Sequence, residues 1–194
     1  MSVAAPAQAP PAQNLPPQDG QGRRRTPALP AALAALHDLV DRLAQAPVWP
    51  LDDDELTGAV DTLSAQIARL EAVRLTLVRE VDGRDLAGRQ DATSTPALLR
   101  ERLRLRPGQA RGLVDLAAAL DGPLSATGAA LAAGQISVDQ AQAIMRAVLG
   151  LPTSVDAATR SRVERFLLQQ AAVFDPGELT RLGAHLKAQL ADHG

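Results

Sequence analysis

Five arginines lie close together in the middle of the sequence, and their guanidinium groups could bind phosphate. They are Arg100, Arg102, Arg104, Arg106 and Arg111, and only Glu101 opposes them within this segment. The local charge is therefore +4, whereas the formal net charge of the whole chain is −2. A chain with that net charge has no strong overall attraction for nucleic acid. Any contact with nucleic acid must therefore come from this basic segment.

The sequence around these arginines predicts two short helices joined by a tight turn. The segment from Thr95 to Leu120 reads TPALLRERLRLRPGQARGLVDLAAAL, in which Arg106-Pro107-Gly108 forms the break. We expect Thr95 to cap the first helix and Pro96 to take its first position. The leucines should bury the opposite side, namely Leu98, Leu99, Leu103 and Leu105. This arrangement resembles a helix-turn-helix, whose second helix enters the major groove of DNA.

Double-stranded DNA is the expected partner of this segment. We expect Arg100 and Arg104 to contact the phosphate backbone, and Gln109 and Arg111 to read base edges. Arg102 and Arg106 complete the set of candidate DNA-binding residues. The backbone amides of Gly108 and Gln109, at a helix N-terminus, could also hold a phosphate. The alternative is a solvated helix face without a ligand, because surface arginines often have no binding role.

No motif for catalysis or metal binding is present in the sequence. The histidines His37, His185 and His193 do not have a metal-binding spacing, and there is no cysteine. The acidic run from Asp52 to Glu55 lacks the ligand spacing of a calcium loop, and the helix dipole explains it. No nucleophile elbow or phosphate-binding loop occurs. We therefore expect a non-enzymatic chain with no metal, cofactor or small-molecule substrate.

The elements that would position the basic segment are all predicted to be helices. Aromatic residues make up only 2% of the chain, and β-branched residues are scarce, so a sheet is disfavoured. The expected fold is all-α, an irregular multi-helix bundle of eight helices. Besides the two above, helices are expected over about 30–46, 52–83, up to 133, 137–149, 155–173 and 176–190. Capping boxes at Asp52/Glu55 and Ser137/Gln140 mark two starts, and Val163, Phe166, Leu167 and Ala171 should point inward.

The longest predicted helix carries a heptad-like apolar line that offers a different function. Its members are Leu56, Val60, Leu63, Ile67, Leu70, Leu77 and Val81, with Arg74 interrupting the series. Such a line is typical of helices that pack on other helices, including those of a second copy. The alternative function is therefore protein–protein interaction or homodimerisation. Under that alternative, acidic neighbours should neutralise the arginines while the apolar line stays open.

The domain organisation follows from composition. Residues 1–28 are rich in Pro, Ala and Gln, contain Arg23-Arg24-Arg25, and are expected to be a disordered tail. The helical domain covers 29–194, divided into a long-helix part (29–92), a helix-turn-helix-like part (93–150) and closing helices (151–194). No signal peptide or apolar run long enough to span a bilayer occurs, so a cytoplasmic location without membrane contact is expected.

Two resemblances support a DNA-facing role. The run from Leu98 to Val148, with Gly134 and Ile136-Ser137 before an Ala-rich helix, resembles the DNA-binding helical domain of ParB partition proteins. A more extensive resemblance covers about Leu51 to Gly194. The ordered elements are the Leu-rich helix, the polar loop, the basic segment, LAAGQISVDQAQAI and FDPGELTRLGAHLKAQLADHG. They resemble the domain of unknown function 222, which typically precedes an HNH endonuclease domain in actinobacterial proteins.

This resemblance implies an all-helical module that, by association, works on DNA. Arg106 stands where relatives often carry Ser or a similar cap, which adds charge at the expected contact. The chain contains no His-Asn-His constellation, so nuclease activity is not expected of it. A truncated relic without a present function is a third interpretation, and a nuclease encoded elsewhere is compatible with the sequence.

Overall fold

The computed structural model describes residues 28–191, and in that range helices joined by turns and loops occur without a strand. The all-α fold class is thereby confirmed, and eight α-helices are present among the described residues. They are α1 (Ala28–Gln45), α2 (Asp53–Gly83), α3 (Thr95–Leu103), α4 (Pro107–Asp121), α5 (Ser125–Ala132), α6 (Val138–Leu149), α7 (Ala157–Gln170) and α8 (Pro176–Ala191). A short 3₁₀ helix, η1 (Gly88–Gln90), lies in the loop before α3. The tail with its three arginines, and His193, lie outside the described residues.

The chain divides into two compact units, Met1–Pro50 and Leu51–Gly194. Within the first, α1 is an amphipathic helix of which no side chain is buried. The second unit holds α2 to α8 and the hydrophobic core. The finer division of the helical domain at residues 92 and 150 stays a prediction.

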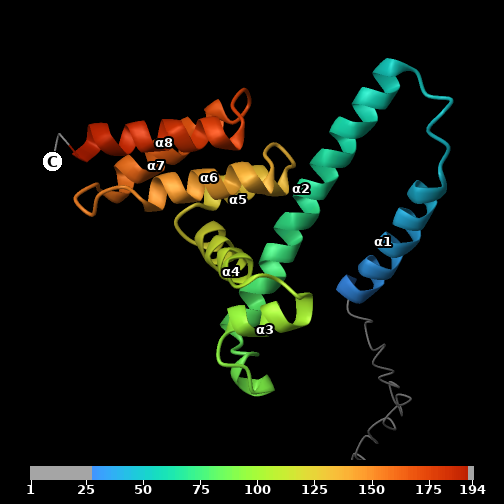
Figure 1. Ribbon diagram of the computed structural model, residues 1–194, viewed down its shortest axis with the longest axis horizontal. Helices are drawn as coiled ribbons and strands as arrows, with labels where there is room; N and C mark the ends of the chain where they lie inside the picture. The colour runs from blue at the N-terminus through green and yellow to red at the C-terminus, as the bar shows by residue number, and fades with distance from the viewer. Residues whose placement is uncertain (1–27, 192–194) are drawn as a thin grey trace, which may run out of the picture. The chain divides into compact units, whose positions relative to one another are not determined.

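The core of the second unit forms where the C-terminal half of α2 packs against α4 and α5. Figure 1 shows α3 and α4 near the C-terminal end of α2, and α6 and α8 running side by side. The largest fully buried side chains are Leu116, Leu124, Leu131, Ile144, Leu167 and Leu179. They come from α4, the α4–α5 turn and the four helices that follow. Aliphatic side chains therefore build this core, because the sequence has few aromatic residues to use.

The helix starts follow the capping patterns of the sequence, with one correction. Reciprocal hydrogen bonds join Asp52 with Glu55 and Ser137 with Gln140, so both predicted capping boxes are confirmed. The prediction that Thr95 caps α3 is wrong. Ser94 is the cap, and its Oγ accepts a hydrogen bond from the amide of Ala97 at 3.3 Å. Thr95 is the first helical residue, and its buried side chain bonds to α2 instead.

Two apolar residues that were expected inside lie on the surface. Leu103 is 49% exposed and Phe166 is 40% exposed. Leu103 is the last residue of α3, and the next residue, Arg104, has φ +54°, so the chain turns before Leu103 can meet the core. In α7 the inward side is instead formed by Val163, Glu164 and Leu167, which are all buried. Glu164 thus takes a core position that the apolar pattern could not reveal.

Buried Glu164 caps α5 from a helix 37 residues further along the chain. Its Oε1 accepts hydrogen bonds from the amide and the hydroxyl of Thr127, both at 2.8 Å. Thr127 lies in the first turn of α5, where amides have no partner within the helix, and the local N-cap residue Leu124 offers no side-chain acceptor. The carboxylate therefore supplies the missing cap and joins α5 to α7.

Replacing Glu164 with Ala should lower the free energy of unfolding by about 2–4 kcal/mol, because two buried donors lose a charged acceptor. Glu164→Gln keeps one acceptor oxygen and should lose less. Chemical denaturation of both variants tests this, with Arg165→Ala on the exposed side of α7 as the control. If Glu164→Ala were as stable as the control, the cap would contribute nothing to folding.

Two glycines mark places where helices approach closely. Gly134 has φ +73°, and a Cβ built there would lie 2.8 Å from the carbonyl oxygen of Ala65 in α2. A Cβ on Gly183 in α8 would lie 2.4 Å from the Cβ of Ala147 in α6. By contrast, a Cβ on Gly112 in α4 would meet nothing within 4 Å. The close contact of α6 with α8 therefore depends on Gly183.

Gly183→Ala and Gly112→Ala should change stability in opposite directions. Gly183→Ala forces α6 and α8 apart and should cost about 1–3 kcal/mol. Gly112→Ala adds a helix-favouring residue in open space and should stabilise by about 0.5–1 kcal/mol. Thermal and chemical denaturation of the two variants checks this, since each serves as the control for the other. Equal effects would mean that the α6–α8 contact is not tight.

Candidate nucleic-acid interface

The basic segment forms two helices joined by a sharp turn. Helix α3 ends at Leu103, Arg104 takes a left-handed conformation with φ +54°, and Arg106 is the extended N-cap of α4. The two helices pack against each other, with Leu98 and Leu99 of α3 buried, and with Ala110 and Leu113 of α4 also buried. These apolar contacts hold the polar sides of both helices outward. These two packed helices and the turn between them are called the helix-turn-helix unit below.

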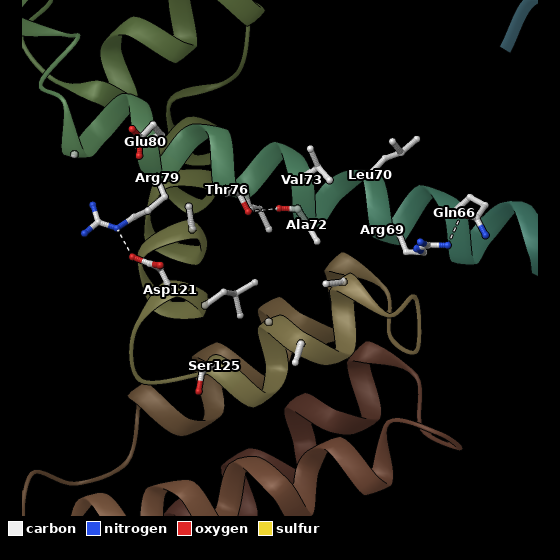
Figure 2. A pocket seen from close by; sticks show the side chains of 17 residues that line it. Gln66, Arg69, Leu70, Ala72, Val73, Thr76, Arg79, Glu80, Asp121 and Ser125 are labelled. Atoms are coloured by element: carbon white, nitrogen blue, oxygen red, sulfur yellow. Dashed lines mark hydrogen bonds and ion pairs between the residues drawn. The ribbon is translucent and has the colours of Figure 1, made fainter. Parts of the chain in front are cut away.

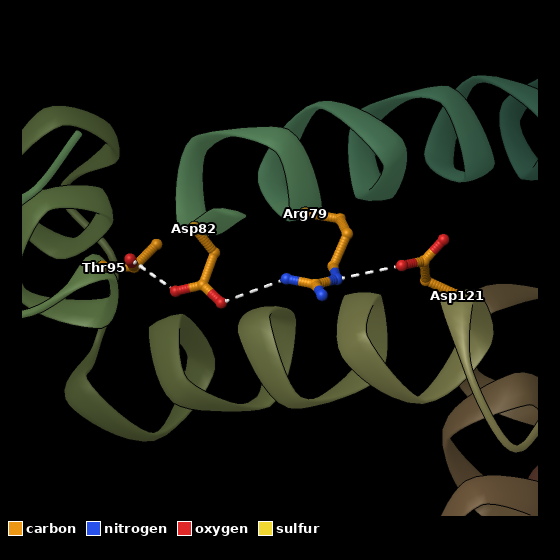
Figure 3. Close-up of polar contacts among 4 residues, drawn as sticks. All are labelled: Arg79, Asp82, Thr95 and Asp121. Carbon is orange, nitrogen blue, oxygen red and sulfur yellow. Dashed lines mark hydrogen bonds and ion pairs between the residues drawn. The ribbon is translucent and has the colours of Figure 1, made fainter. Parts of the chain in front are cut away.

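A chain of polar contacts fixes this unit to α2, as Figure 3 shows. The hydroxyl of Thr95 donates to Asp82 Oδ1 at 2.7 Å, and Asp82 Oδ2 lies 3.5 Å from Arg79 Nη1. Arg79 Nε in turn donates to Asp121 Oδ2 at 3.0 Å. The start of α3 and the end of α4 are thus both tied to the last turns of α2. The orientation of the helix-turn-helix unit in this part of the protein is therefore defined.

All six candidate residues of the basic segment lie on the surface. Arg100, Arg102, Arg104, Arg106, Gln109 and Arg111 are exposed. Within residues 28–191, the ion pairs involve other side chains, and none joins these five arginines to an acidic residue. Among the described residues, these arginines therefore keep their positive charge without a direct ion pair. An exposed positive cluster of this kind attracts polyanions.

Arg100 and Arg111 line one groove between the two helices. The groove has a volume of about 450 Å³ and is also lined by Ser94, Pro96, Ala97, Pro107 and Gly108. Pro107 and Gly108, in the first turn of α4, place the N-terminus of this helix beside the groove, and the first amides of a helix have no partner within it. Two guanidinium groups beside a helix N-terminus form an electropositive site that suits a phosphate. The structure thus brings Arg100 together with Arg111.

Arg102 and Gln109 are held by contacts that differ from the sequence expectation. Arg102 Nη2 donates to Gln90 Oε1 of η1 at 2.7 Å, and Arg102 does not line the groove. Residues two apart on a helix point to different sides, so Arg102 lies away from Arg100. Gln109 Oε1 accepts a hydrogen bond from the amide of Arg106 at 3.1 Å. Gln109 therefore caps α4, which occupies the oxygen that adenine recognition would need.

Substitutions of Gln109 should separate capping from DNA contact. Gln109→Glu keeps an acceptor for the Arg106 amide and adds negative charge at a helix N-terminus, so stability should be kept or rise slightly. DNA affinity should fall, because the new carboxylate repels phosphate. Gln109→Ala should instead lower stability by about 0.5–1 kcal/mol. Denaturation and DNA titration of both variants test this, and native affinity in Gln109→Glu would place this residue away from DNA.

A second, larger groove lies between α2, α4 and α5. Its volume is about 790 Å³, and Figure 2 shows its wall of Leu70, Val73 and Thr76 on α2 with the Arg79–Asp121 pair at one end. Small residues of α5, including Gly128 and Ala132, form the opposite wall. None of the six candidate residues lines this groove. Among the described residues there is also no cluster of three or more potential metal ligands.

The fold and the basic surface define a helical module with an exposed helix-turn-helix unit. The family described as Domain of unknown function (DUF222) matches residues 57–194, and the chain belongs to that family. No curated protein and no solved structure matches the chain. In the part of the chain that the structure describes, no helix is sufficiently long and apolar to cross a membrane.

Proposed function

We propose that this chain is a non-catalytic module that binds and positions double-stranded DNA through the helix-turn-helix unit formed by α3 and α4. Arg100 and Arg111 would hold a backbone phosphate in the groove between the helices. Arg104 and Arg106, in the turn, would contact neighbouring phosphates. The first turn of α4 would lie at the major groove.

The observation that carries this proposal is a cluster of exposed arginines that have no acidic ion-pair partner. The five arginines are exposed, and none forms an ion pair with an acidic side chain among the described residues. Other arginines of the described residues, such as Arg162 and Arg165, also form no ion pair, so the distinguishing feature is that five such arginines lie close together. Clustered, unneutralised guanidinium groups on two rigid helices favour a polyanionic partner.

The same proposal assigns the module a place beside a nuclease. Its family resemblance implies association with HNH endonuclease domains, which need a DNA strand held in a defined position. A rigid helix-turn-helix unit, tied to α2 through Arg79 and Thr95, would supply that position. Phosphate contacts set register and orientation on the duplex without reading sequence. The module would thus contribute placement, and another domain would contribute cleavage.

The decisive measurement is binding of the full chain to mixed duplex DNA across a salt series. Native affinity should fall steeply with salt, and Arg100→Glu/Arg111→Glu should lower affinity at least about tenfold. The slope of log affinity against log salt should become shallower by about 0.9 for each lost phosphate contact. Arg106→Glu, added as a third change, should remove most of the remaining binding.

The matched control is Arg162→Glu/Arg165→Glu, which changes the same charge on the exposed side of α7. It should bind as the native chain does. Equal loss in both double variants would indicate a response to net charge alone, and the assignment to the groove would fail. Absence of salt-dependent binding by the native chain at low ionic strength would exclude the proposal altogether.

A further inference from the structure

Most of the N-terminal half of α2 has no partner within its own unit, and the turn at Gly134 approaches it only at Ala65. From Asp53 to Ile67 no side chain is buried, and burial begins only at Ala68. An isolated helix of this length is marginally stable in water. Its capping box with Asp52 and Glu55 helps, but such a cap contributes only about 1 kcal/mol. Packing against another protein surface would therefore stabilise this half of the helix.

A line of large apolar side chains stays open along α2. Val60 is 65% exposed, Leu63 and Ile67 are each 53% exposed, and Leu56, Leu70 and Leu77 are 38–43% exposed. These residues alternate in steps of three and four, so they face one side of the helix. A continuous exposed apolar stripe of this kind usually marks an interaction surface.

The stripe has the residue pattern of a two-stranded coiled coil. Leu occupies every d position, namely Leu56, Leu63, Leu70 and Leu77. The a positions are Asp53, Val60, Ile67 and Arg74. Apolar residues at every d position and at the two central a positions form a seam of the kind that packs on another helix. The two charged a positions, one near each end, then decide how the second helix is oriented.

A parallel pair would bring identical a positions together, so Asp53 would face Asp53 and Arg74 would face Arg74. In an antiparallel pair an a position lies opposite a d position. The seam positions are placed symmetrically about residue 65. In the antiparallel pair, Leu63 of one copy would therefore meet Ile67 of the other, and Val60 would meet Leu70. Leu56 would meet Arg74. Asp53 would then lie one layer from Arg74 of the second copy, at both ends of the seam, where Arg74 would be shared with Glu71 of its own helix. Only the antiparallel arrangement pairs opposite charges.

We propose that the chain forms an antiparallel homodimer through α2, with Asp53 of each copy paired to Arg74 of the other. The seam from Asp53 to Leu77 is about 36 Å long at 1.5 Å per residue, whereas an 18-residue helix such as α1 spans about 27 Å. A second α2 therefore matches the seam in length as well as in charge. This inference does not rest on DNA binding, because the six candidate residues lie outside α2.

The test uses the full chain in sedimentation-velocity experiments over a concentration series, without DNA. The native chain should be dimeric. Asp53→Arg alone and Arg74→Asp alone should each weaken the dimer at least about tenfold, because each homodimer then holds two like-charge pairs. An equimolar mixture of the two variants should recover dimerisation, since both pairs in the heterodimer have opposite charges. Circular dichroism confirms that each variant is folded.

The matched control exchanges Asp139→Arg and Arg146→Asp in α6, where both side chains are exposed. These variants should dimerise as the native chain does, alone and mixed. Leu63→Arg, in the free half of α2, should abolish dimerisation without unfolding the core. A monomeric native chain would overturn the proposal. A dimer whose single variants do not recover on mixing would exclude the antiparallel pairing.

Discussion

Burial of the C-terminal half of α2 is the contact on which the rest of the second unit depends. Only Ala68, Leu75 and Val78 of α2 are buried, and α4 and α5 pack against this helix. Because the buried strip is narrow, most of the helix circumference remains open. The polar link from Arg79 to Asp121, and from Asp82 to Thr95, lies at the end of that strip. The packing of α2 against α4 and α5 thus sets both the orientation of the helix-turn-helix unit and the exposure of the apolar seam on α2.

Local features of this fold were predictable from the sequence, because neighbouring residues determine them. The Asp52/Glu55 and Ser137/Gln140 capping boxes join residues three apart, so their pattern is visible in the chain. Glu164 was missed because its partner, Thr127, is 37 residues away. Half-buried Arg160 was also missed, because its guanidinium donates to four carbonyl oxygens 5 to 12 residues earlier, at the end of α6 and in the following turn, and no capping pattern has that spacing. A buried charge gives no periodic signal when it replaces an apolar residue.

The sequence predicted which residues form the candidate site, but it did not predict how their side chains are arranged. Charge counting selects all five arginines equally, yet the structure groups Arg100 with Arg111 and holds Arg102 against Gln90. Helical spacing alone separates Arg100 from Arg102, so that division was available from the sequence. The left-handed turn at Arg104 was not, because non-glycine residues rarely adopt it. The cap formed by Gln109 shows that a side chain suited to base readout can be used within its own helix.

The distribution of charge along α2 and the helix-turn-helix unit makes the proposed DNA binding compatible with the proposed dimer. The first half of α2 carries Asp53, Asp54, Glu55 and Asp61 with no basic residue, while the arginine cluster follows the other end of the helix. A polyanion is therefore attracted to one end and repelled from the other, which leaves the acidic half free for a protein partner. In the antiparallel dimer the two C-terminal ends of α2 would lie about 54 Å apart, more than the roughly 34 Å of one DNA turn. If the helix-turn-helix units of the two copies lay as far apart as these ends, they would not read half-sites one turn apart on a straight duplex. They would instead hold two separate DNA segments, or two distant points on one bent segment.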